Sequence, residues 1–171
     1  MLVDSFAPLY RNDARLLILG SMPGVASLGA AEYYAHPRNL FWHFMGEALA
    51  FDPALPYAQR VLALHEGGVA VWDVLARCRR PGSLDSAIDP LSVEANDIAA
   101  LLRACPGIRR ICFNGTAAES LFRRHIVLPE PMPELLRLPS SSPANAGMSR
   151  GVKRTLWLAA LQGQTLVRGQ C

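Results

Sequence analysis

RLLILGSMPG, residues 15–24, decides the fold class of this chain. Its first part, Arg15–Gly20, is a short apolar run that ends at glycine, as is typical of a strand buried on both faces of a parallel sheet. Three other runs share this length and composition, and together the four predict a small parallel sheet. They are Gly68–Leu75 (GVAVWDVL), Ile108–Asn114 (IRRICFN) and Glu134–Ser140 (ELLRLPS).

The segments between these runs have apolar residues at helical spacing. Two of the predicted helices are preceded by serines that commonly cap helices, Ser92 and Ser149. Strands that alternate with helices predict an α/β fold in which helices cover both faces of a parallel sheet. The predicted helices are Asn39–Ala50, Tyr57–His65, Val93–Ala104, Thr116–His125 and Ser149–Leu161.

Length and composition bound the class of protein. The chain has 171 residues, of which 51% are hydrophobic and 18% charged, which predicts one globular domain over residues 1–171. No apolar stretch is long enough to cross a bilayer. The N-terminal segment carries an acid at Asp4 and lacks a long apolar core, so it does not resemble a secretion signal, and we expect a cytoplasmic protein. A net charge of +3 permits a polyanionic partner without requiring one.

The cysteines and histidines do not predict a metal site. Cys78, Cys105, Cys112 and Cys171 form no CxxC pair, and the four histidines show no HExxH spacing. Cysteines within or beside apolar segments are expected to be reduced, buried thiols. We therefore predict neither a metal nor another cofactor.

In parallel sheets the functional loops follow the carboxyl ends of the strands. This rule selects residues 20–24 (GSMPG), 73–83 (DVLARCRRPGS), 114–115 (NG) and 140–145 (SSSPAN). Glycine at both ends of the first loop would let the backbone approach a ligand closely, although a tight turn is the alternative. A dinucleotide site is disfavoured there because GxGxxG is absent and no helix is predicted immediately after the loop.

Several polar and aromatic residues gather in Tyr33–Trp42 (YYAHPRNLFW). Tyr34 precedes a turn and could offer its ring for stacking, whereas Phe41 and Trp42 are expected in the core. Asn39 could serve chemistry or could simply cap the following helix.

Two later loops carry side chains suited to nucleic-acid contacts. The amide of Asn114 presents an acceptor and a donor side by side, which could read a cis amide edge, or could instead form an Asx turn. The loop Pro139–Asn145 places serines between two prolines, which suits phosphate contacts but also an ordinary surface loop.

The order of these segments resembles the uracil-DNA glycosylase superfamily. Its mismatch-specific uracil and thymine glycosylases have a GINPG loop, an FAHPxNxFW segment and a PSS loop in the same order, and the resemblance spans residues 17–153. One departure is Met22, which stands where those relatives have an Asn that holds the attacking water. Another is Leu138, which replaces the histidine that opens the last motif in the classical uracil enzymes.

These departures make the chain similar to the hypoxanthine-DNA glycosylase branch of the superfamily. The resemblance implies a three-layer α/β/α sandwich around a short, mostly parallel four-stranded sheet, and a monofunctional hydrolase that acts on DNA as a monomer. In that branch the asparagine that corresponds to Asn39 is thought to serve catalysis, and we assign it the orientation of water.

The other site residues predicted on this basis fall into two groups. Tyr34 would stack on a flipped base, Asn114 would read its edge, and the backbone N–H groups of Ser21 and Met22 would stabilise the departing base, with the Met22 side chain facing the pocket. Residues predicted to contact DNA phosphates are Ser140, Ser141, Ser142, Pro143, Asn145, Arg38, Arg150 and Lys153.

Three alternatives stay open at this point. The first is a glycosylase that excises uracil from G·U mismatches. The second is an α/β enzyme that processes small nucleosides or nucleotides. The third is a DNA-binding relative without activity, because Met22 removes the usual water ligand.

Overall fold

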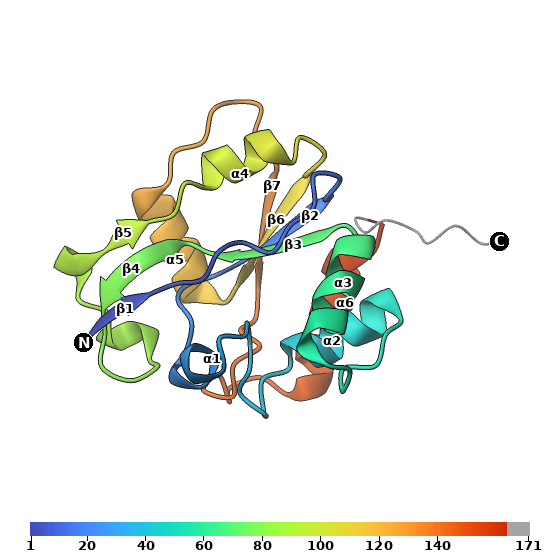
Figure 1. Ribbon diagram of the computed structural model, residues 1–171, viewed down its shortest axis with the longest axis horizontal. Coiled ribbons are helices and arrows are strands. Elements are labelled where there is room, and N and C mark those ends of the chain that lie inside the picture. Colours follow the sequence, from blue (N-terminus) through green and yellow to red (C-terminus); the bar gives the residue numbers. More distant parts are fainter. Residues whose placement is uncertain (164–171) are drawn as a thin grey trace.

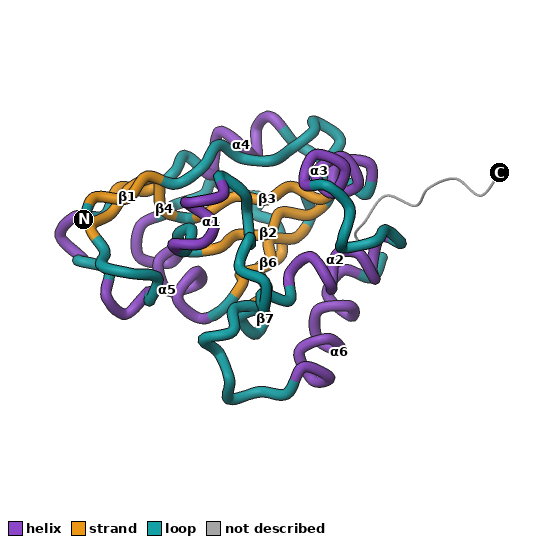
Figure 2. Tube along the Cα trace, turned by 60° about the horizontal axis from the view of Figure 1, so that its bottom comes forward, coloured by secondary structure: helices purple, strands orange, loops and turns teal. Residues whose placement is uncertain are grey.

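A four-stranded parallel sheet forms the centre of the computed structural model, which describes residues 1–163. Its strand order is β3-β2-β6-β7, and all three neighbouring pairs are parallel (Figures 1 and 2). The strands are β2 (Leu16–Gly20), β3 (Val69–Asp73), β6 (Arg110–Asn114) and β7 (Glu134–Leu138). Each lies within one of the four apolar runs of the sequence, so the predicted sheet is confirmed.

Helices cover both faces of this sheet (Figure 1). Successive side chains of a strand point to opposite faces. Accordingly, Leu16 and Ile18 of β2 pack with α2, α3 and α6, whereas Leu17 and Leu19 pack with α4 and α5, and all four are fully buried. The predicted α/β/α layers are therefore confirmed. The helices are α2 (Phe41–Leu49), α3 (Tyr57–Glu66), α4 (Ile98–Ala104), α5 (Thr116–His125) and α6 (Arg150–Leu161).

A second, antiparallel sheet was not predicted. It consists of β1 (Leu2–Asp4), β4 (Leu75–Arg79) and β5 (Glu94–Ala95), in the order β1-β4-β5. The run that we predicted as one strand to Leu75 is thus divided at Val74. β1 and β5 have only three and two residues, and β4 is only partly buried, so these strands carry little periodic signal. In addition, β1 pairs with a segment more than seventy residues away.

One helix starts later than predicted, and one short helix was not predicted. Helix α4 begins at Ile98, where the Asp97 side chain accepts a hydrogen bond from the Ala100 N–H at 2.9 Å. Ser92 instead accepts a hydrogen bond from the Arg79 N–H and ends a short 3-10 turn, Pro90–Ser92. A short helix, α1 (Val25–Ala30), directly follows the first loop, where we predicted none.

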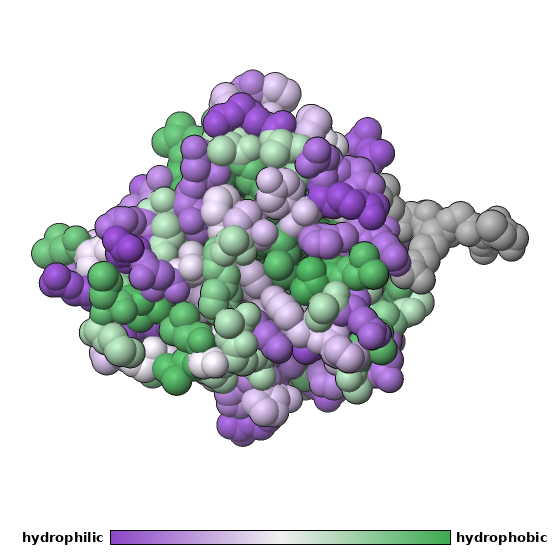
Figure 3. All heavy atoms as spheres, viewed as in Figure 1, coloured by the Kyte–Doolittle hydropathy of each residue, from purple (hydrophilic) through white to green (hydrophobic). Residues whose placement is uncertain are grey.

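Other predictions hold. Ser149 caps α6 by accepting a hydrogen bond from the Val152 N–H. Cys78, Cys105 and Cys112 are buried free thiols, whereas Cys171 lies outside the described residues. Polar and apolar residues intermix on the face shown in Figure 3. Within residues 1–163 no helix has the length and apolar character needed to span a membrane.

Candidate functional site

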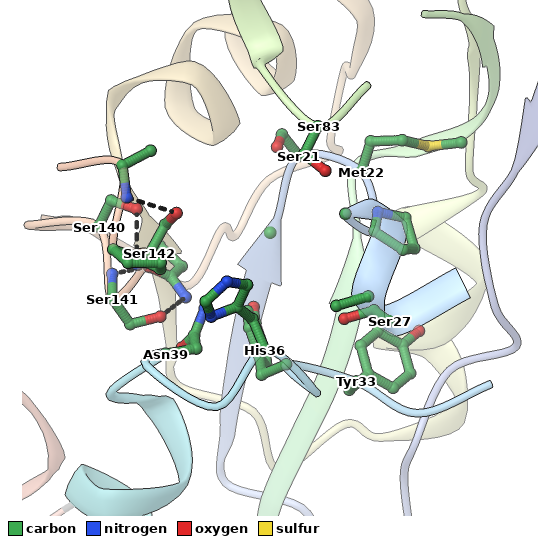
Figure 4. Close-up of a pocket in the computed structure, with 18 of the residues that line it drawn as sticks. Ser21, Met22, Ser27, Tyr33, His36, Asn39, Ser83, Ser140, Ser141 and Ser142 are labelled. Carbon is green, nitrogen blue, oxygen red and sulfur yellow. Dashed lines mark hydrogen bonds between the residues drawn. The ribbon is translucent and has the colours of Figure 1, made fainter. Parts of the chain in front are cut away.

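A cavity of about 420 Å³ lies at the carboxyl ends of the parallel strands. It is bordered by the loop after β2, the segment before α2, the end of β3 and the serine-rich loop after β7 (Figure 4). The fold thus brings together segments from both halves of the chain. The predicted site residues that line it are Ser21, Met22, Tyr34, Arg38, Asn39, Asn114, Ser140, Ser141, Ser142 and Pro143.

Gly20, the last residue of β2, lies at the floor of this cavity. A β-carbon at this position would overlap with Asp73 Oδ1 and would lie 3.0 Å from the Tyr34 hydroxyl oxygen. Only glycine therefore fits between these two side chains. We expected a ligand to approach this glycine closely, and in the structure the approaching groups are two side chains of the chain itself.

Asp73, at the end of β3, is a candidate functional residue that the sequence analysis missed. It is 3% exposed, lines the cavity, and its Oδ2 atom has no hydrogen-bond partner among the described residues. Burial raises the pKa of this carboxyl to about 7, the charge of Asp85 adds to the increase, and Arg80 opposes it. A carboxyl group perturbed in this way inside a cavity is typical of a functional site. The available signal was an acid at the carboxyl end of a buried strand.

Tyr34 is held in place by its own neighbours. Its backbone has a φ of 55°, and its ring stacks on the Phe41 ring with 4.1 Å between centroids. The hydroxyl is buried and makes no hydrogen bond of good geometry among residues 1–163; burial raises its pKa, and the nearby Asn114 amide opposes this increase. One ring face is therefore occupied by Phe41, so base stacking stays a prediction for the other face. The hydroxyl contributes a polar atom that the sequence analysis overlooked.

Asn114 does not present a free amide edge. Its Nδ2 donates a hydrogen bond to Ser141 Oγ at 2.8 Å, and its Oδ1 accepts one from the Ser141 N–H at 2.9 Å. The chain itself therefore occupies the edge that we predicted would read a base. In this structure Asn114 instead fastens the serine-rich loop to the end of β6.

The serine-rich loop is further stiffened by local hydrogen bonds. Ser140 Oγ accepts from the Ser142 N–H, and Ser142 Oγ accepts from the Ala144 N–H, both at 3.2 Å. The Ser141 carbonyl accepts a hydrogen bond from the Leu40 N–H at 3.0 Å, which links this loop to the start of α2. Because these serine oxygens act as acceptors, their hydroxyl protons remain to donate outward.

Lys153 is not placed for the predicted phosphate contact. It is 4% exposed, and its Nζ donates a hydrogen bond to the Asn145 carbonyl at 2.7 Å. Burial also lowers the pKa of its ammonium group. Lys153 thus supports the loop from inside the fold, whereas Arg38 and Arg150 are exposed. Arg150 and Lys153 are both basic and lie on the same helix, so the residue types alone could not predict that Arg150 is exposed and Lys153 is buried.

Asn39 combines the two roles that the sequence left open. Its Oδ1 accepts a hydrogen bond from the Phe41 N–H at 2.9 Å, so the side chain stabilises the first turn of α2. The residue also lines the cavity, beside His36 in Figure 4. The Phe41 bond fixes the orientation of the amide, and the second lone pair of Oδ1 and both Nδ2 protons stay available.

Met22 borders the cavity, but its side chain does not point to the part of the cavity near Asn39, as we had predicted. It is 7% exposed and belongs to the core cluster shared with α4 and α5, and Figure 4 shows it turned away from Asn39 and His36. The Ser21 hydroxyl donates a hydrogen bond to Asp85 Oδ1 at 2.7 Å. The backbone N–H groups of Ser21 and Met22 make no hydrogen bond among the described residues, so they stay available to a ligand.

The cavity therefore combines an unpartnered carboxyl oxygen, an unpartnered hydroxyl, an oriented amide and free backbone donors. Within residues 1–163 no three histidine, cysteine or acidic side chains are grouped so that they could hold a metal ion. Such a set can bind a flat, polar molecule and position a water molecule beside it.

Comparisons with known proteins show the family to which the chain belongs. Residues 7–162 match the family model described as the uracil DNA glycosylase superfamily. A protein named hypoxanthine DNA glycosylase from Methanosarcina acetivorans is 32% identical over 95% of this chain and 99% of its own length. A protein of the same name from Methanosarcina barkeri is 33% identical over 66% of this chain and 70% of its own length. The solution structure of a candidate uracil DNA glycosylase from M. acetivorans is 33% identical and superposes with a TM-score of 0.79, covering 94% of this chain and 97% of that one.

Proposed function

Because the chain belongs to the uracil DNA glycosylase superfamily, we propose that it is a DNA glycosylase that removes hypoxanthine from DNA. The two Methanosarcina relatives support this choice of base through their names. The observation that carries it is the pair of unpartnered polar atoms in the cavity, Asp73 Oδ2 and the Tyr34 hydroxyl. The Asp73 carboxyl, through its Oδ1 atom, and the Tyr34 hydroxyl both flank Gly20, so the two side chains meet at this point of the cavity.

These two atoms form an acceptor beside a donor when Asp73 is ionised. Hypoxanthine presents a donor, N1–H, beside an acceptor, O6, so its edge is complementary to the pair. Adenine presents an acceptor at N1 and a donor at N6, which would leave polar groups unpaired at about 1–3 kcal/mol each. We therefore propose that Asp73 and Tyr34, and not Asn114 as first predicted, read the edge of the flipped base.

Uracil is a second candidate substrate. Its N3–H and O4 present the same donor and acceptor order as the hypoxanthine edge, so the Asp73 and Tyr34 pair accepts either base. Met22 offers no polar side chain to the cavity, in contrast to the mismatch-specific relatives, and this favours hypoxanthine.

DNA would lie across the mouth of the cavity with the target base turned out of the duplex, at a cost of a few kcal/mol. The exposed side chains of Arg38 and Arg150 would contact phosphates, together with the hydroxyl groups of the serine-rich loop. Lys153 would act indirectly, by holding the Asn145 carbonyl and so the shape of the loop.

Bond cleavage would proceed with charge separation between the sugar and the base. Asn39 would orient a water molecule toward the sugar C1′, since an amide is too weak a base to remove its proton at neutral pH. The departing base would carry negative charge, which the free N–H groups of Ser21 and Met22 would stabilise.

The test is a single-turnover excision assay on labelled duplexes that contain one inosine, uracil or xanthine. We expect fastest cleavage at inosine, measured as strand breakage after alkaline treatment, with or without EDTA. No excision from any of the three duplexes would refute glycosylase activity. Activity that disappears with EDTA and returns with added metal would refute a cofactor-free mechanism.

Gly20→Ala tests whether the Asp73 and Tyr34 pair reads the base. The added methyl group would displace the Asp73 carboxyl, so we expect excision to slow by about tenfold to a hundredfold. Gly29→Ala is the matched control, because its β-carbon would meet nothing within 4 Å. Wild-type excision by Gly20→Ala would argue against a base-reading role for this corner of the cavity.

A further inference from the structure

We propose that Arg80 is a positioning residue that clamps the first loop and, with Asp85, forms a charged pair at the edge of the cavity that holds the base-reading carboxyl of Asp73. Arg80 lies in the segment after β4, residues 80–85. The sequence analysis selected residues 73–83 as a functional loop, but it assigned no role to any residue there. This inference rests on the proposed function, because it concerns the same cavity.

Arg80 joins the first loop to this segment through a completely buried guanidinium group. Its Nη2 donates a hydrogen bond to the Pro23 carbonyl, and its Nε donates one to the Gly82 carbonyl at 3.0 Å. Burying a guanidinium is costly unless its donors are used, and here they hold two loops together. The backbone N–H of Arg80 is in turn fixed by the Met1 carbonyl at 3.0 Å.

Two neighbouring side chains hold the same loop from the same segment. Ser83 Oγ accepts a hydrogen bond from the Val25 N–H at 2.8 Å, and Asp85 Oδ1 accepts one from the Ser21 hydroxyl at 2.7 Å. Residues 21–25 are therefore attached to residues 80–85 at three successive points. These contacts fix the direction of the Ser21 and Met22 N–H groups, which have no hydrogen-bond partner within residues 1–163.

Asp85 lines the same cavity as Asp73, and Arg80 lies beside Asp85, so two opposite charges are placed near the Asp73 carboxyl. Arg80 Nη1 lies 3.9 Å from Asp85 Oδ1 and has no hydrogen bond among the described residues. The negative charge of Asp85 raises the pKa of Asp73, and the positive charge of Arg80 lowers it. The other titratable groups that interact with Asp73 are the hydroxyls of Tyr33 and Tyr34, which stay neutral at physiological pH because burial raises their pKa.

Three substitutions distinguish the positioning of the first loop by Arg80 from the effect of the Arg80 and Asp85 charges on Asp73. Arg80→Gln removes the cation, so the acid limb of the pH–rate profile for inosine excision should move to higher pH by about one unit. Asp85→Asn removes the anion but keeps an acceptor for Ser21, so the limb should move to lower pH. Arg80→Lys keeps the charge but loses the planar fork, so excision should slow about tenfold while the limb stays in place.

Arg79→Lys is the matched control, because Arg79 is exposed and its side chain forms no ion pair or hydrogen bond among the described residues. We expect it to leave both rate and limb unchanged. The pKa of Asp73, followed by carbon NMR of its carboxyl group, gives a readout independent of activity and should shift in the same directions in Arg80→Gln and Asp85→Asn.

If the acid limb of the pH–rate profile stays in place in Arg80→Gln and Asp85→Asn, or moves in the same direction in both, the proposed effect of these charges on Asp73 is wrong. An Arg80→Lys enzyme as fast as wild type would overturn the clamp. If the Arg80 variants do not fold, Ser83→Ala decides the clamp through its rate and Asp85→Asn decides the charge through the NMR titration. Wild-type protein that leaves inosine intact would refute the proposed function, and the NMR titration would still test the charges.

Discussion

Asn39→Ala is expected to slow single-turnover excision of hypoxanthine by about two orders of magnitude or more, the loss typical of one preorganised polar group. The amide lines the cavity and is held in one orientation by the Phe41 N–H. DNA affinity should change little, because the side chain acts on water and not on phosphates. The measurements are single-turnover rates and duplex binding at fixed salt.

Loss of the Phe41 hydrogen bond will also destabilise Asn39→Ala by about 1 kcal/mol. Asp97→Ala provides a matched control, because it removes a side-chain acceptor from the start of another helix, α4, which lies outside the cavity. Asn39→Asp keeps the oxygen that caps α2 and should recover the lost stability. An Asn39→Ala protein that is destabilised yet fully active would limit Asn39 to its structural role.

Asp73→Ala is expected to reduce excision by about tenfold to a hundredfold, because N1–H of the base would lose its acceptor in a buried site. In wild-type protein the pKa of Asp73 is raised to about 7, so excision should increase as the pH rises through 7 and the carboxyl ionises. Asp73→Asn keeps an acceptor but cannot titrate. We therefore expect its excision rate to lose the acid limb near pH 7.

Asp73 should also reduce the stability of the protein above neutral pH. Because its folded-state pKa is raised, the folded protein retains a proton between about pH 4 and pH 7 that the unfolded chain has released. Stability from this group therefore falls as the pH rises through that window. Asp73→Asn removes the effect and should increase the free energy of unfolding at pH 8 by up to about 4 kcal/mol.

Denaturant unfolding at pH 4 and pH 8 checks this prediction. The gain of Asp73→Asn over wild type should be small at pH 4 and larger at pH 8. Equal effects at both pH values would mean that Asp73 is not a buried carboxyl with a raised pKa. Excision by Asp73→Ala at the wild-type rate would show that another group reads the base.

The sequence by itself determined the central sheet and the edge at which the site forms. The four apolar runs predict β2, β3, β6 and β7 because a strand covered on both faces must be apolar throughout, and this property is local. The order of the motifs also indicated the superfamily, and Asn39 and the serine-rich loop do line one cavity. By contrast, β1 and β5 have only three and two residues, and β4 is only partly buried, so their residues carry no such pattern.

Only the tertiary structure decided which polar groups face the cavity. Asp73 and Tyr34 meet over Gly20, Asn114 is bound by Ser141, and Lys153 is buried beneath Asn145. Each contact except the last joins segments far apart in sequence. The type of a polar residue does not reveal whether its hydrogen-bond partner is solvent, a ligand or another segment. The tertiary packing decides which of these partners it meets. Periodicity reports burial along one element, whereas the pairing of polar atoms depends on how separate elements approach one another.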